Sequence, residues 1–563
     1  MKSKKTRASQ SGARFYNILD RIVLMILVGL VCLFVLYPLL CIIKQSVSGA
    51  HGFSFAAYKS IFDKNLHLLK NSVFVAVLSA LISTGLAVAV AFSVRFTFKK
   101  LRGCLMGILL ISMVSPPFIA SLAYIQLFGR NGLISKGLLG LSLNPYGWIG
   151  VVIMQSLFFT SLNALLLIGM LERIDLSMLQ ASADLGATRG RTLYKIVLPL
   201  IRPSLLICFL LSFIRSMADF GTPIVIGGRF ETVATEIYMQ IIGYSDLSKS
   251  SALNVLLLIP ALAGFVLYRY LMRKNDKIFA GNNNKATGAE EDFRLKGMSA
   301  VIVYLIAAIF FVTMFLEYGS IFLNSFTKNM RGTLTFTTQY FDALLERNMD
   351  TFVRSIAYAL IVALVGTFVG ILLSYYIERR RIRFGNLIDF VVTMPYMLPG
   401  SCFGIGYILA FNHEPLKLTG TALIVIANMI FKQMSITTKA VTASFSQISL
   451  NIDDAARDLG ANKLRVFWDV LLPNLKPAFA TGFVNNFTNA MITAGSVIFL
   501  ITPGQKIAVF TLFDSINTGK YGEASMIATF IIWITVLINV IFYIGFSKER
   551  GRKKGVSGIK KSK

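Results

Sequence analysis

Gln180-Ala-Ser-Ala-Asp-Leu-Gly186 and Asp454-Ala-Ala-Arg-Asp-Leu-Gly460 are two copies of one pattern, and they decide how the chain is divided. In each copy nine residues follow the glycine before the pattern closes, on Ile196-Val-Leu-Pro199 or on Val470-Leu-Leu-Pro473. The offset of 274 residues, from Gln180 to Asp454, is constant through both copies. Constant spacing of this kind indicates an internal repeat.

The chain around these copies is both apolar and basic. Its 563 residues are 55% hydrophobic with a mean hydropathy of +0.67. Only 15% are charged, whereas soluble proteins carry about 25%. The formal net charge of +29 is typical of a nucleic-acid-binding protein, but that class gives no reason for 45 Phe and 20 Met. Nucleic-acid binding is therefore excluded, and a multi-pass membrane protein remains.

Cysteine and histidine indicate neither a disulfide framework nor a metal motif. The five cysteines are odd in number and lie in or beside apolar runs, and the three histidines are scattered. We therefore expect no cofactor in this chain.

Twelve stretches are apolar enough to cross a membrane as helices, since about 20 residues span the roughly 30 Å of hydrocarbon. The first is too long for a secretory signal and lacks a cleavage site, so we interpret it as retained. Basic residues gather in segments 95–102 and 379–383, which predicts that these segments and both termini are cytosolic. The predicted spans are 22–43, 71–94, 104–127, 148–170, 203–226, 251–271, 299–323, 354–377, 387–411, 420–442, 478–502 and 523–546.

A polar segment separates these spans into two sets of six. Residues 272–297 are rich in Asn, Gly and charged side chains, which is typical of a flexible linker. We predict an all-α integral membrane protein of about 12 transmembrane helices, built as two homologous six-helix halves, residues 1–271 and 298–563. The repeated pattern falls in a cytosolic loop of each half, and we name residues 172–199 and 446–473 the first and second repeat loops.

Each repeat loop is expected to contain a short helix. Ser177 and Asn451 are predicted to cap its start, and Gly186 and Gly460 to end it, because glycine tolerates the left-handed conformation that follows a helix. Small side chains on such a helix let it lie closely in a partner's groove. The loops are therefore candidates for docking a second protein.

The repeated pattern resembles EAA-x3-G-x9-I-x-LP, the loop signature of permease subunits in binding-protein-dependent ABC importers. The departures are small, since Gln180 and Asp454 replace the Glu, Ser182 an Ala and Val470 the Ile. The resemblance covers nearly the whole chain as a fused pair of permease halves and implies the type I ABC importer permease fold. It implies that the repeat loops couple the chain to an ATPase through Gln180, Ala181, Ser182, Asp184, Gly186, Asp454, Ala455, Ala456, Asp458 and Gly460.

The resemblance also implies the partners. The phosphate-binding pattern GxxxxGK[S/T] does not occur in the sequence, so we expect ATP and Mg²⁺ on two copies of a separate ABC ATPase subunit. The chain is expected to be a transport subunit and not an enzyme. A substrate-binding protein on the extracellular or periplasmic side is the other expected partner. The expected location is the bacterial plasma (inner) membrane, with both termini cytoplasmic.

The cargo is suggested by resemblance alone. A fused pair of this length is similar to the ferric-iron permeases, as are segments 218–228 and 397–412, which implies ferric iron moved by alternating access. Thiamine and aminoalkylphosphonate permeases look similar, so these cargoes stay open. A secondary transporter or a polytopic membrane enzyme is the alternative of another class. The first needs no repeated docking loop, and the second needs a catalytic cluster that the sequence does not show.

Four polar residues are candidates for the translocation path. Arg215 and Asp219 are four apart in a predicted span, hence on one helix face, and ionisable residues inside a membrane are costly. One interpretation is that Asp219 meets a cationic cargo and is the single candidate for metal contact. The other is a structural ion pair. Asn489 and Thr493 hold the corresponding positions of the second half, so a charged site would be asymmetric.

Two prolines are further path candidates. Pro117 and Pro395 lie in the same predicted helix of each half, where an interrupted helix is typical of a transport path. A kink that serves packing alone is the open alternative.

Overall fold

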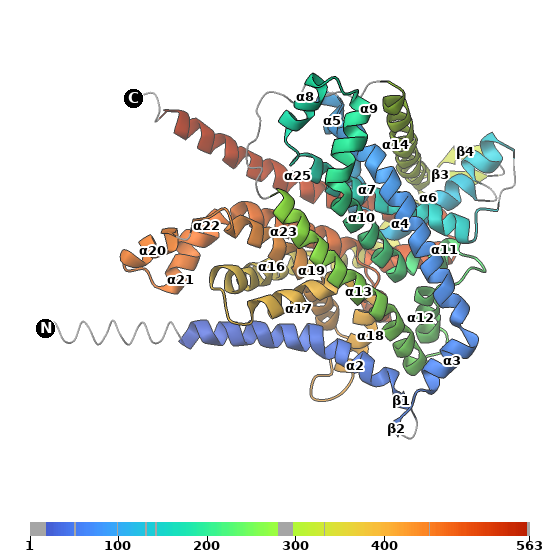
Figure 1. Ribbon diagram of the computed structural model, residues 1–563. Helices are drawn as coiled ribbons and strands as arrows, with labels where there is room; N and C mark the ends of the chain where they lie inside the picture. The colour runs from blue at the N-terminus through green and yellow to red at the C-terminus, as the bar shows by residue number, and fades with distance from the viewer. Residues whose placement is uncertain are drawn as a thin grey trace.

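The chain forms a bundle of long helices with two small strand pairs (Figure 1). The structure, a computed structural model, describes residues 18–49, 52–97, 99–129, 132–140, 144–279, 297–330, 333–449 and 451–559. Strand β1 (Ser48–Gly49) pairs antiparallel with β2 (Gly52–Phe53), and β3 (Thr327–Met330) with β4 (Thr333–Phe336). Helices dominate because a helix satisfies its own backbone hydrogen bonds in a lipid environment.

The first half begins with the span Ile18–Ser46, which contains the π-helical turn η1 (Cys32–Leu36) and α2 (Tyr37–Ser46). The elements that follow are α3 (Ala56–Lys64), α4 (Leu66–Arg95), α5 (Lys99–Val114), α6 (Pro117–Phe128), η2 (Leu133–Leu138), α7 (Trp148–Leu171), α8 (Leu176–Asp184), α9 (Arg189–Thr192), η3 (Leu193–Val197), α10 (Leu198–Ala218), α11 (Gly221–Ile226), α12 (Val233–Ile242) and α13 (Leu247–Phe279).

The second half repeats this order. Its elements are α14 (Met298–Ser325), α15 (Gln339–Ala343), η4 (Leu344–Asn348), α16 (Met349–Ser374), η5 (Tyr375–Arg379), α17 (Gly385–Met397), α18 (Gly400–Phe411), α19 (Ala422–Phe445), α20 (Asn451–Asp458), α21 (Lys463–Arg465), η6 (Val466–Leu471), α22 (Leu472–Asn474), α23 (Lys476–Ile492), η7 (Val497–Phe499), η8 (Pro503–Gln505), α24 (Ala508–Asn517) and α25 (Tyr521–Ile559).

Helices occupy all twelve places where spans were predicted. Within the described residues, eight are long and apolar enough to cross a membrane, or up to ten when each of two bent pairs counts as one span. The remaining two, α19 and α23, are more polar or shorter. In α19 the apolar run is broken by Asn428, Lys432 and Gln433, and α23 has 17 residues. Polar side chains on these helices therefore account for the difference from twelve.

Two predicted spans end earlier than expected. Residues 203–226 and 478–502 were predicted as continuous helices, but α10 ends at Ala218 and α23 at Ile492. The two ends keep the 274-residue offset of the repeat loops, so both halves share the interruption. The predicted linker is also shorter at its start, because α13 continues to Phe279; residues 280–296 lie outside the described residues.

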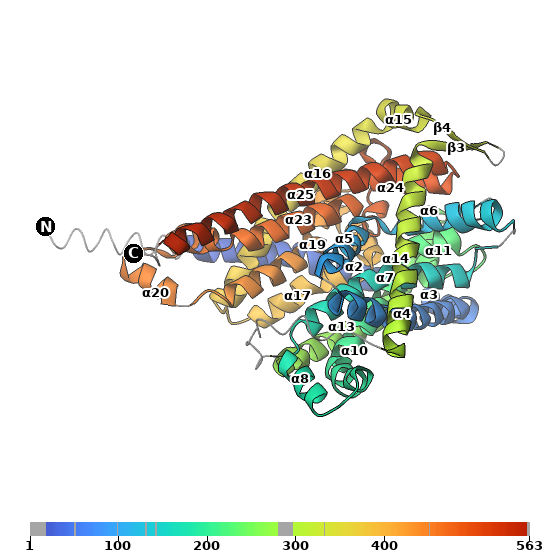
Figure 2. The same cartoon turned by 90° about the horizontal axis from the view of Figure 1, so that it is seen from above.

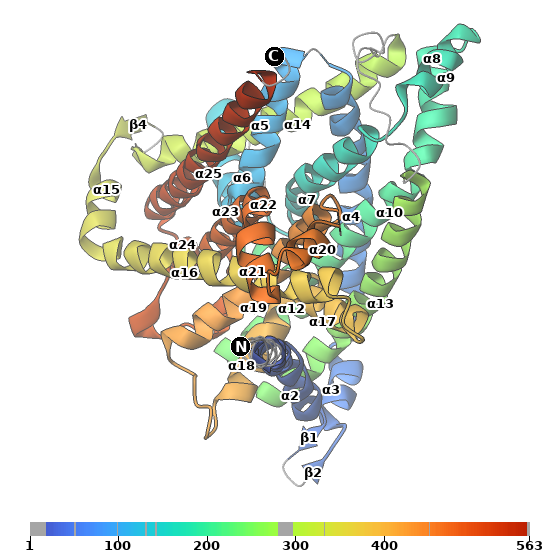
Figure 3. The ribbon, with the colours of Figure 1, turned by 90° about the vertical axis from the view of Figure 1, so that its left-hand side faces the viewer.

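The first membrane helix of each half packs against the other half. Helix α2 contacts α18 of the second half as well as α13, and α14 contacts α4 and α6 of the first half. Figure 2 shows α14 crossing the helices of the first half. The largest apolar core accordingly draws buried residues from both halves. Figure 3 looks onto the side that carries α20 and α21, with α8 and α9 toward its upper edge.

Candidate functional site

The short helices of the two repeat loops begin in the same way. The Asp175 carboxylate accepts a hydrogen bond from the Ser177 N–H at 2.9 Å, and the Ser449 hydroxyl accepts one from the Asn451 N–H at 3.3 Å. This bond lowers the pKa of Asp175 below its ordinary value. The predicted caps Ser177 and Asn451 are therefore wrong by two residues, because the preceding turn supplies the acceptors.

The two helices also end in the same way. Gly186 and Gly460 have φ values of 75° and 86°, which confirms the prediction of glycine in the left-handed conformation. The residue after each glycine donates back to the helix, Ala187 N–H to the Ser182 carbonyl at 3.1 Å and Ala461 N–H to the Ala456 carbonyl at 3.0 Å. These bonds give the two loops one backbone shape.

Most of the predicted docking residues are accessible on these helices. In the first loop Ser182 is the exception, because its hydroxyl is buried against the Thr192 hydroxyl at 2.8 Å. In the second loop Ala456 is half-buried. The exposed residues are Gln180, Ala181, Asp184, Gly186, Asp454, Ala455, Asp458 and Gly460.

A leucine that the sequence reasoning missed is the most exposed apolar side chain of each loop. Leu185 is 88% exposed and Leu459 is 90% exposed, and both directly precede the terminating glycine. Met178 and Ile452 are also exposed, at positions related by the same offset. Exposed apolar side chains at the same positions of both loops indicate a protein contact surface. The identical Asp-Leu-Gly in both copies was the available signal.

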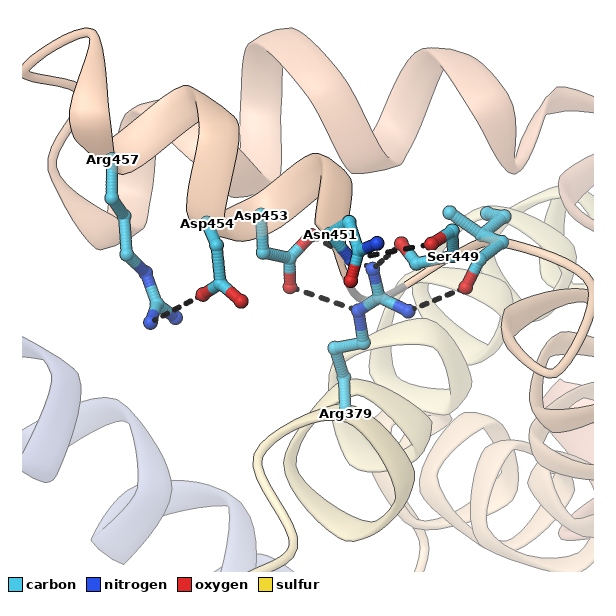
Figure 4. A network of polar contacts seen from close by, with 7 residues as sticks. Arg379, Ser449, Asn451, Asp453, Asp454 and Arg457 are labelled. Carbon is cyan, nitrogen blue, oxygen red and sulfur yellow. Dashed lines mark hydrogen bonds and ion pairs between the residues drawn. The ribbon is translucent and has the colours of Figure 1, made fainter.

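The second repeat loop is held to the membrane helices by an arginine clamp (Figure 4). Arg379, at the end of η5, donates to both carboxylate oxygens of Asp453 at 2.8 and 2.9 Å. It also donates to the carbonyls of Ile448 and Ser449, each at 2.8 Å. The Arg379 and Asp453 side chains are 3% and 10% exposed, so the pair is largely shielded from water.

The same turn also contacts the first membrane helix. Arg380 donates to the Asp20 carboxylate at 2.9 Å, and the Tyr376 hydroxyl donates to the other carboxylate oxygen at 3.0 Å. Asp20 belongs to the span Ile18–Ser46 of the first half. The turn after α16 therefore links the second repeat loop to a helix of the other half.

At the position of Asp453, the first repeat loop has an apolar contact instead; one charged contact of this loop lies elsewhere, between Glu172 and Arg102 of α5. Leu179 holds the position that corresponds to Asp453, and it is 2% exposed in a core cluster with Leu171, Ile174 and Leu193. The two loops therefore share a backbone shape but have different contacts at this position.

The expected pairing of Arg215 with Asp219 is wrong. Helix α10 ends at Ala218, so Asp219 lies beyond it with an extended backbone (φ −81°, ψ 109°). Its carboxylate accepts from the Gln155 amide at 3.0 Å and from the Thr222 N–H at 3.2 Å. Arg215 donates to the Tyr396 hydroxyl of the second half at 2.7 Å. The helix end turns the two charges toward different partners.

The second half has a similar backbone conformation at the corresponding position, but the residues there, Asn489 and Thr493, carry no charge. Thr493 follows the end of α23 with φ −70° and ψ 118°, and its hydroxyl accepts from the Gln433 amide at 2.7 Å. Asn489 donates to the Asn485 carbonyl at 2.8 Å within its own helix. The predicted asymmetry between Asp219 and Thr493 therefore holds in the contacts as well.

The proline-containing helices are interrupted in both halves. Pro117 begins α6, and the helical segments on either side of the break meet at 106°. In the second half the break falls at Leu398-Pro399, with an angle of 109°, and Pro395 lies inside α17 one turn earlier. Breaks were predicted in both helices, and Pro395 itself does not form one.

In each half, the segment that follows α10 or α23 lies close to the start of the helix after the proline break, α6 or α18. A Cβ on Gly221 would lie 2.4 Å from the Phe118 ring at the start of α6. A Cβ on Gly495, at the equivalent offset, would lie 3.8 Å from Gly400 Cα at the start of α18, and one on Gly400 would lie 2.6 Å from the Gly495 carbonyl carbon. Glycine therefore allows the two interrupted segments within each half to approach closely.

Lys432 is a polar residue of this region that the sequence reasoning missed. It lies in α19, and its ammonium is 3.4 Å from the Ser496 hydroxyl. The ammonium also faces the break at Gly400, where an added Cβ would lie 2.8 Å from it. A lysine in the middle of a predicted span was the signal, since such residues are costly in a membrane.

A large cavity between the halves is lined by residues of α6, α14 and α15 among others. These three elements extend to the end of the molecule away from α20 (Figure 2). The volume of the cavity is about 1230 Å³, and its polar lining includes Lys136, Tyr146, Tyr340, Tyr521 and Glu523. In the part of the chain that the structure describes, no group of three or more His, Cys, Asp or Glu side chains is placed to hold a metal ion. The cavity is suited to a visiting solute or protein segment.

Comparison with known proteins agrees with this architecture. The sequence model of the family described as binding-protein-dependent transport system inner membrane component matches residues 81–277 and 366–546. The ferric transport system permease protein FbpB of Actinobacillus pleuropneumoniae is 29% identical over 534 residues, 92% of this chain and 77% of that protein. A protein of Haemophilus influenzae named as a ferric transport system permease is 30% identical over 505 residues, 86% of this chain and 78% of its own length.

A shorter relative matches one half only. The molybdenum transport system permease protein ModB of Haemophilus influenzae is 29% identical over 219 residues, which are 38% of this chain and 95% of ModB. Two interrupted helix bundles with a repeat loop each thus define a membrane permease whose two halves are fused in one chain. The chain belongs to the family of binding-protein-dependent transport system inner membrane components. It is a multi-pass membrane protein and the permease subunit of an ABC importer.

Proposed function

We propose that this permease moves ferric iron into the cytoplasm by alternating access, driven by ATP hydrolysis on a separate ATPase subunit. A binding protein would deliver the iron at the face that carries the large cavity. The repeat loops would lie on the opposite, cytoplasmic face together with both termini, in the plasma membrane of a bacterium. Two ATPase copies, each with ATP and Mg²⁺, would dock below.

The observation that carries the coupling role is the pair of exposed leucines. Leu185 and Leu459 stand at one position of two loops with one backbone shape, beside the accessible residues of the repeated motif. Two identical ATPase subunits need two similar docking surfaces, which the internal repeat supplies. A secondary transporter would have no use for this duplicated surface.

The proposal of ferric iron is supported by the extent of the likeness. Relatives named for ferric transport match this chain through both halves, over 86–92% of its length. The cavity lining adds chemistry of the right kind, because Tyr146, Tyr340, Tyr521 and Glu523 offer hard oxygen donors to an arriving ferric ion. Thiamine or an aminoalkylphosphonate is the alternative cargo.

Uptake by cells that depend on this permease tests the proposal. Cells that express the full chain with its binding protein and ATPase should accumulate ⁵⁵Fe(III), and they should not accumulate labelled thiamine or 2-aminoethylphosphonate. Accumulation of either organic cargo without iron would refute the assignment. The matched control is the same set of proteins with an ATPase that binds but does not hydrolyse ATP.

The control also separates the two classes of transporter. An importer driven by ATP stops when hydrolysis stops, even while the membrane potential is intact. Uptake that continues with the inactive ATPase and collapses with a protonophore would identify a secondary transporter.

A further inference from the structure

A small cavity lies beside the helix break of the first half, apart from the large one. It has room for about one water molecule, with a volume of about 10 Å³. Its polar lining comes from both halves: Ser112, Ser115 and Ser161 from the first, and Glu317 and Tyr318 from α14 of the second. This position is where α5 ends at Val114 and α6 begins at Pro117.

Glu317 is the unusual member of this lining. Its residue is 4% exposed, and its Oε1 atom has no hydrogen-bond partner among the described residues. This burial keeps the carboxyl group away from water. No Lys or Arg lines the cavity, so no basic side chain there balances the carboxylate.

The surroundings of Glu317 favour a positive occupant. A buried carboxylate without a counter-charge is costly. Helix α5 ends at Val114, beside the cavity, so the negative end of its dipole adds to the carboxylate. The Ser115 and Tyr318 hydroxyl oxygens lie 2.7 Å apart, and the Ser161 hydroxyl has no partner of its own in the described structure. Hydroxyl and carboxylate oxygens are the ligands that hard cations prefer.

We propose that this cavity binds one small monovalent cation of the size of Na⁺. One carboxylate balances one positive charge, and the volume admits one dehydrated ion. The ion would be held between Glu317 of the second half and the serine hydroxyls at the first-half break. It would therefore hold α14 of the second half against the first half, as a structural ion distinct from the transported cargo.

Direct binding of ²²Na⁺ to the purified full-length permease in lipid nanodiscs tests the site. The wild-type chain should bind about one Na⁺ per chain, and Li⁺ should compete better than K⁺ because the cavity is small. Glu317→Gln, which keeps the shape and removes the charge, should weaken binding at least tenfold. Replacement of choline chloride by NaCl at constant ionic strength should raise the unfolding temperature of the wild type, since the ion binds the folded state, but not that of Glu317→Gln.

A serine variant and its control allow the site to be tested even if Glu317→Gln does not fold. Ser161→Ala should weaken Na⁺ binding several-fold. Ser251→Ala is the matched control, because Ser251 is equally buried and its hydroxyl is unpartnered among the described residues, but it lies in α13 away from the cavity. Absence of saturable Na⁺ binding to the wild type would overturn the proposal, including the case in which Glu317 carries only a proton. Unchanged binding in Ser161→Ala, or in a folded Glu317→Gln, would also overturn it.

Discussion

The two repeat loops have one backbone shape but are anchored by different forces. In the first loop, Leu179 packs in an apolar cluster; in the second, Asp453 takes the same position and is clamped by Arg379. Apolar packing depends on close contact with many neighbours, whereas a shielded ion pair depends on one partner and is costly to break. The comparison teaches that one helical unit, repeated in two halves, can be held by an ion pair in one copy and by apolar contacts at the same position of the other.

Removal of the clamp should have the largest effect. Arg379→Leu leaves the Asp453 carboxylate shielded and unpaired, which costs about 3–5 kcal/mol for a buried pair. We expect the second loop to detach, with faster amide exchange in α20 and loss of transport. Hydrogen exchange of α20 and α8 in the same sample measures the difference between the loops.

A double variant tests whether the ion pair itself holds the second loop. Arg379→Leu with Asp453→Leu recreates the apolar anchor of the first loop, so exchange in α20 should return toward the wild-type rate. If the double variant is as damaged as Arg379→Leu alone, the Arg379 contacts to the Ile448 and Ser449 carbonyls, and not the ion pair, hold the loop.

Loss of an exposed leucine should have the next largest effect. Burial of a leucine contributes about 1.5–3 kcal/mol, so Leu185→Asp or Leu459→Asp should weaken ATPase binding by about 10–100-fold. Under the proposed function each loop binds a separate ATPase copy, so each single variant should still retain one copy. Co-purification and native mass spectrometry count them.

A third leucine supplies the control. Leu138 is 78% exposed but lies in η2, outside both repeat loops. Leu138→Asp should retain both ATPase copies. Equal loss in this variant would mean that a new charge on the surface, and not the docking position, weakens the complex.

Variants of the residues that follow the ends of α10 and α23 should have smaller effects, which a measurement of uptake can detect. Asp219→Asn replaces a charged acceptor, which receives two hydrogen bonds, by a neutral one, a change of about 1.5 kcal/mol. Uptake should fall about tenfold while ATPase binding stays intact. Thr493→Val in the second half removes one neutral bond and should have a weaker effect; a stronger effect there would mean that Thr493, not Asp219, controls the path.

The smallest effect concerns the helix starts. Because the folded-state pKa of Asp175 is lowered, its contribution to the first turn of α8 is present above the ordinary carboxyl pKa. It is lost as the pH falls through the lowered value. Amide exchange at Ser177, corrected for intrinsic rates, should therefore rise in acid. Asp175→Ser copies the hydroxyl cap of the second loop and should abolish this acid response; persistence of the response would assign it to another group.

The success of the sequence predictions depended on how local each signal was. Gly186 and Gly460 were correctly expected to end short helices, because a left-handed residue after a helix needs only its own lack of a side chain. The breaks near Pro117 and Pro395 were expected for a similar reason. Ser177 and Asn451 were misassigned as caps because several residues of one turn compete for the same N–H groups.

Contacts between distant residues were beyond such reasoning. Helical periodicity paired Arg215 with Asp219, but the helix ends between them, and Arg215 reaches Tyr396, 181 residues away. Leu185 and Leu459 drew no notice because exposure depends on what packs nearby. The burial of Glu317 follows from the way α14 crosses the first half.

The sequence by itself determined the membrane class, the twofold plan and the glycines that end the two repeat-loop helices, because apolar runs and glycine act on the chain locally. Tertiary structure alone decided the surroundings of each polar group: the clamp on Asp453, the bond from Arg215 to Tyr396 and the burial of Glu317, whose Oε1 atom has no partner among the described residues. In an apolar surrounding every polar group needs a partner, and only the packing of the two halves brings the available partners within reach.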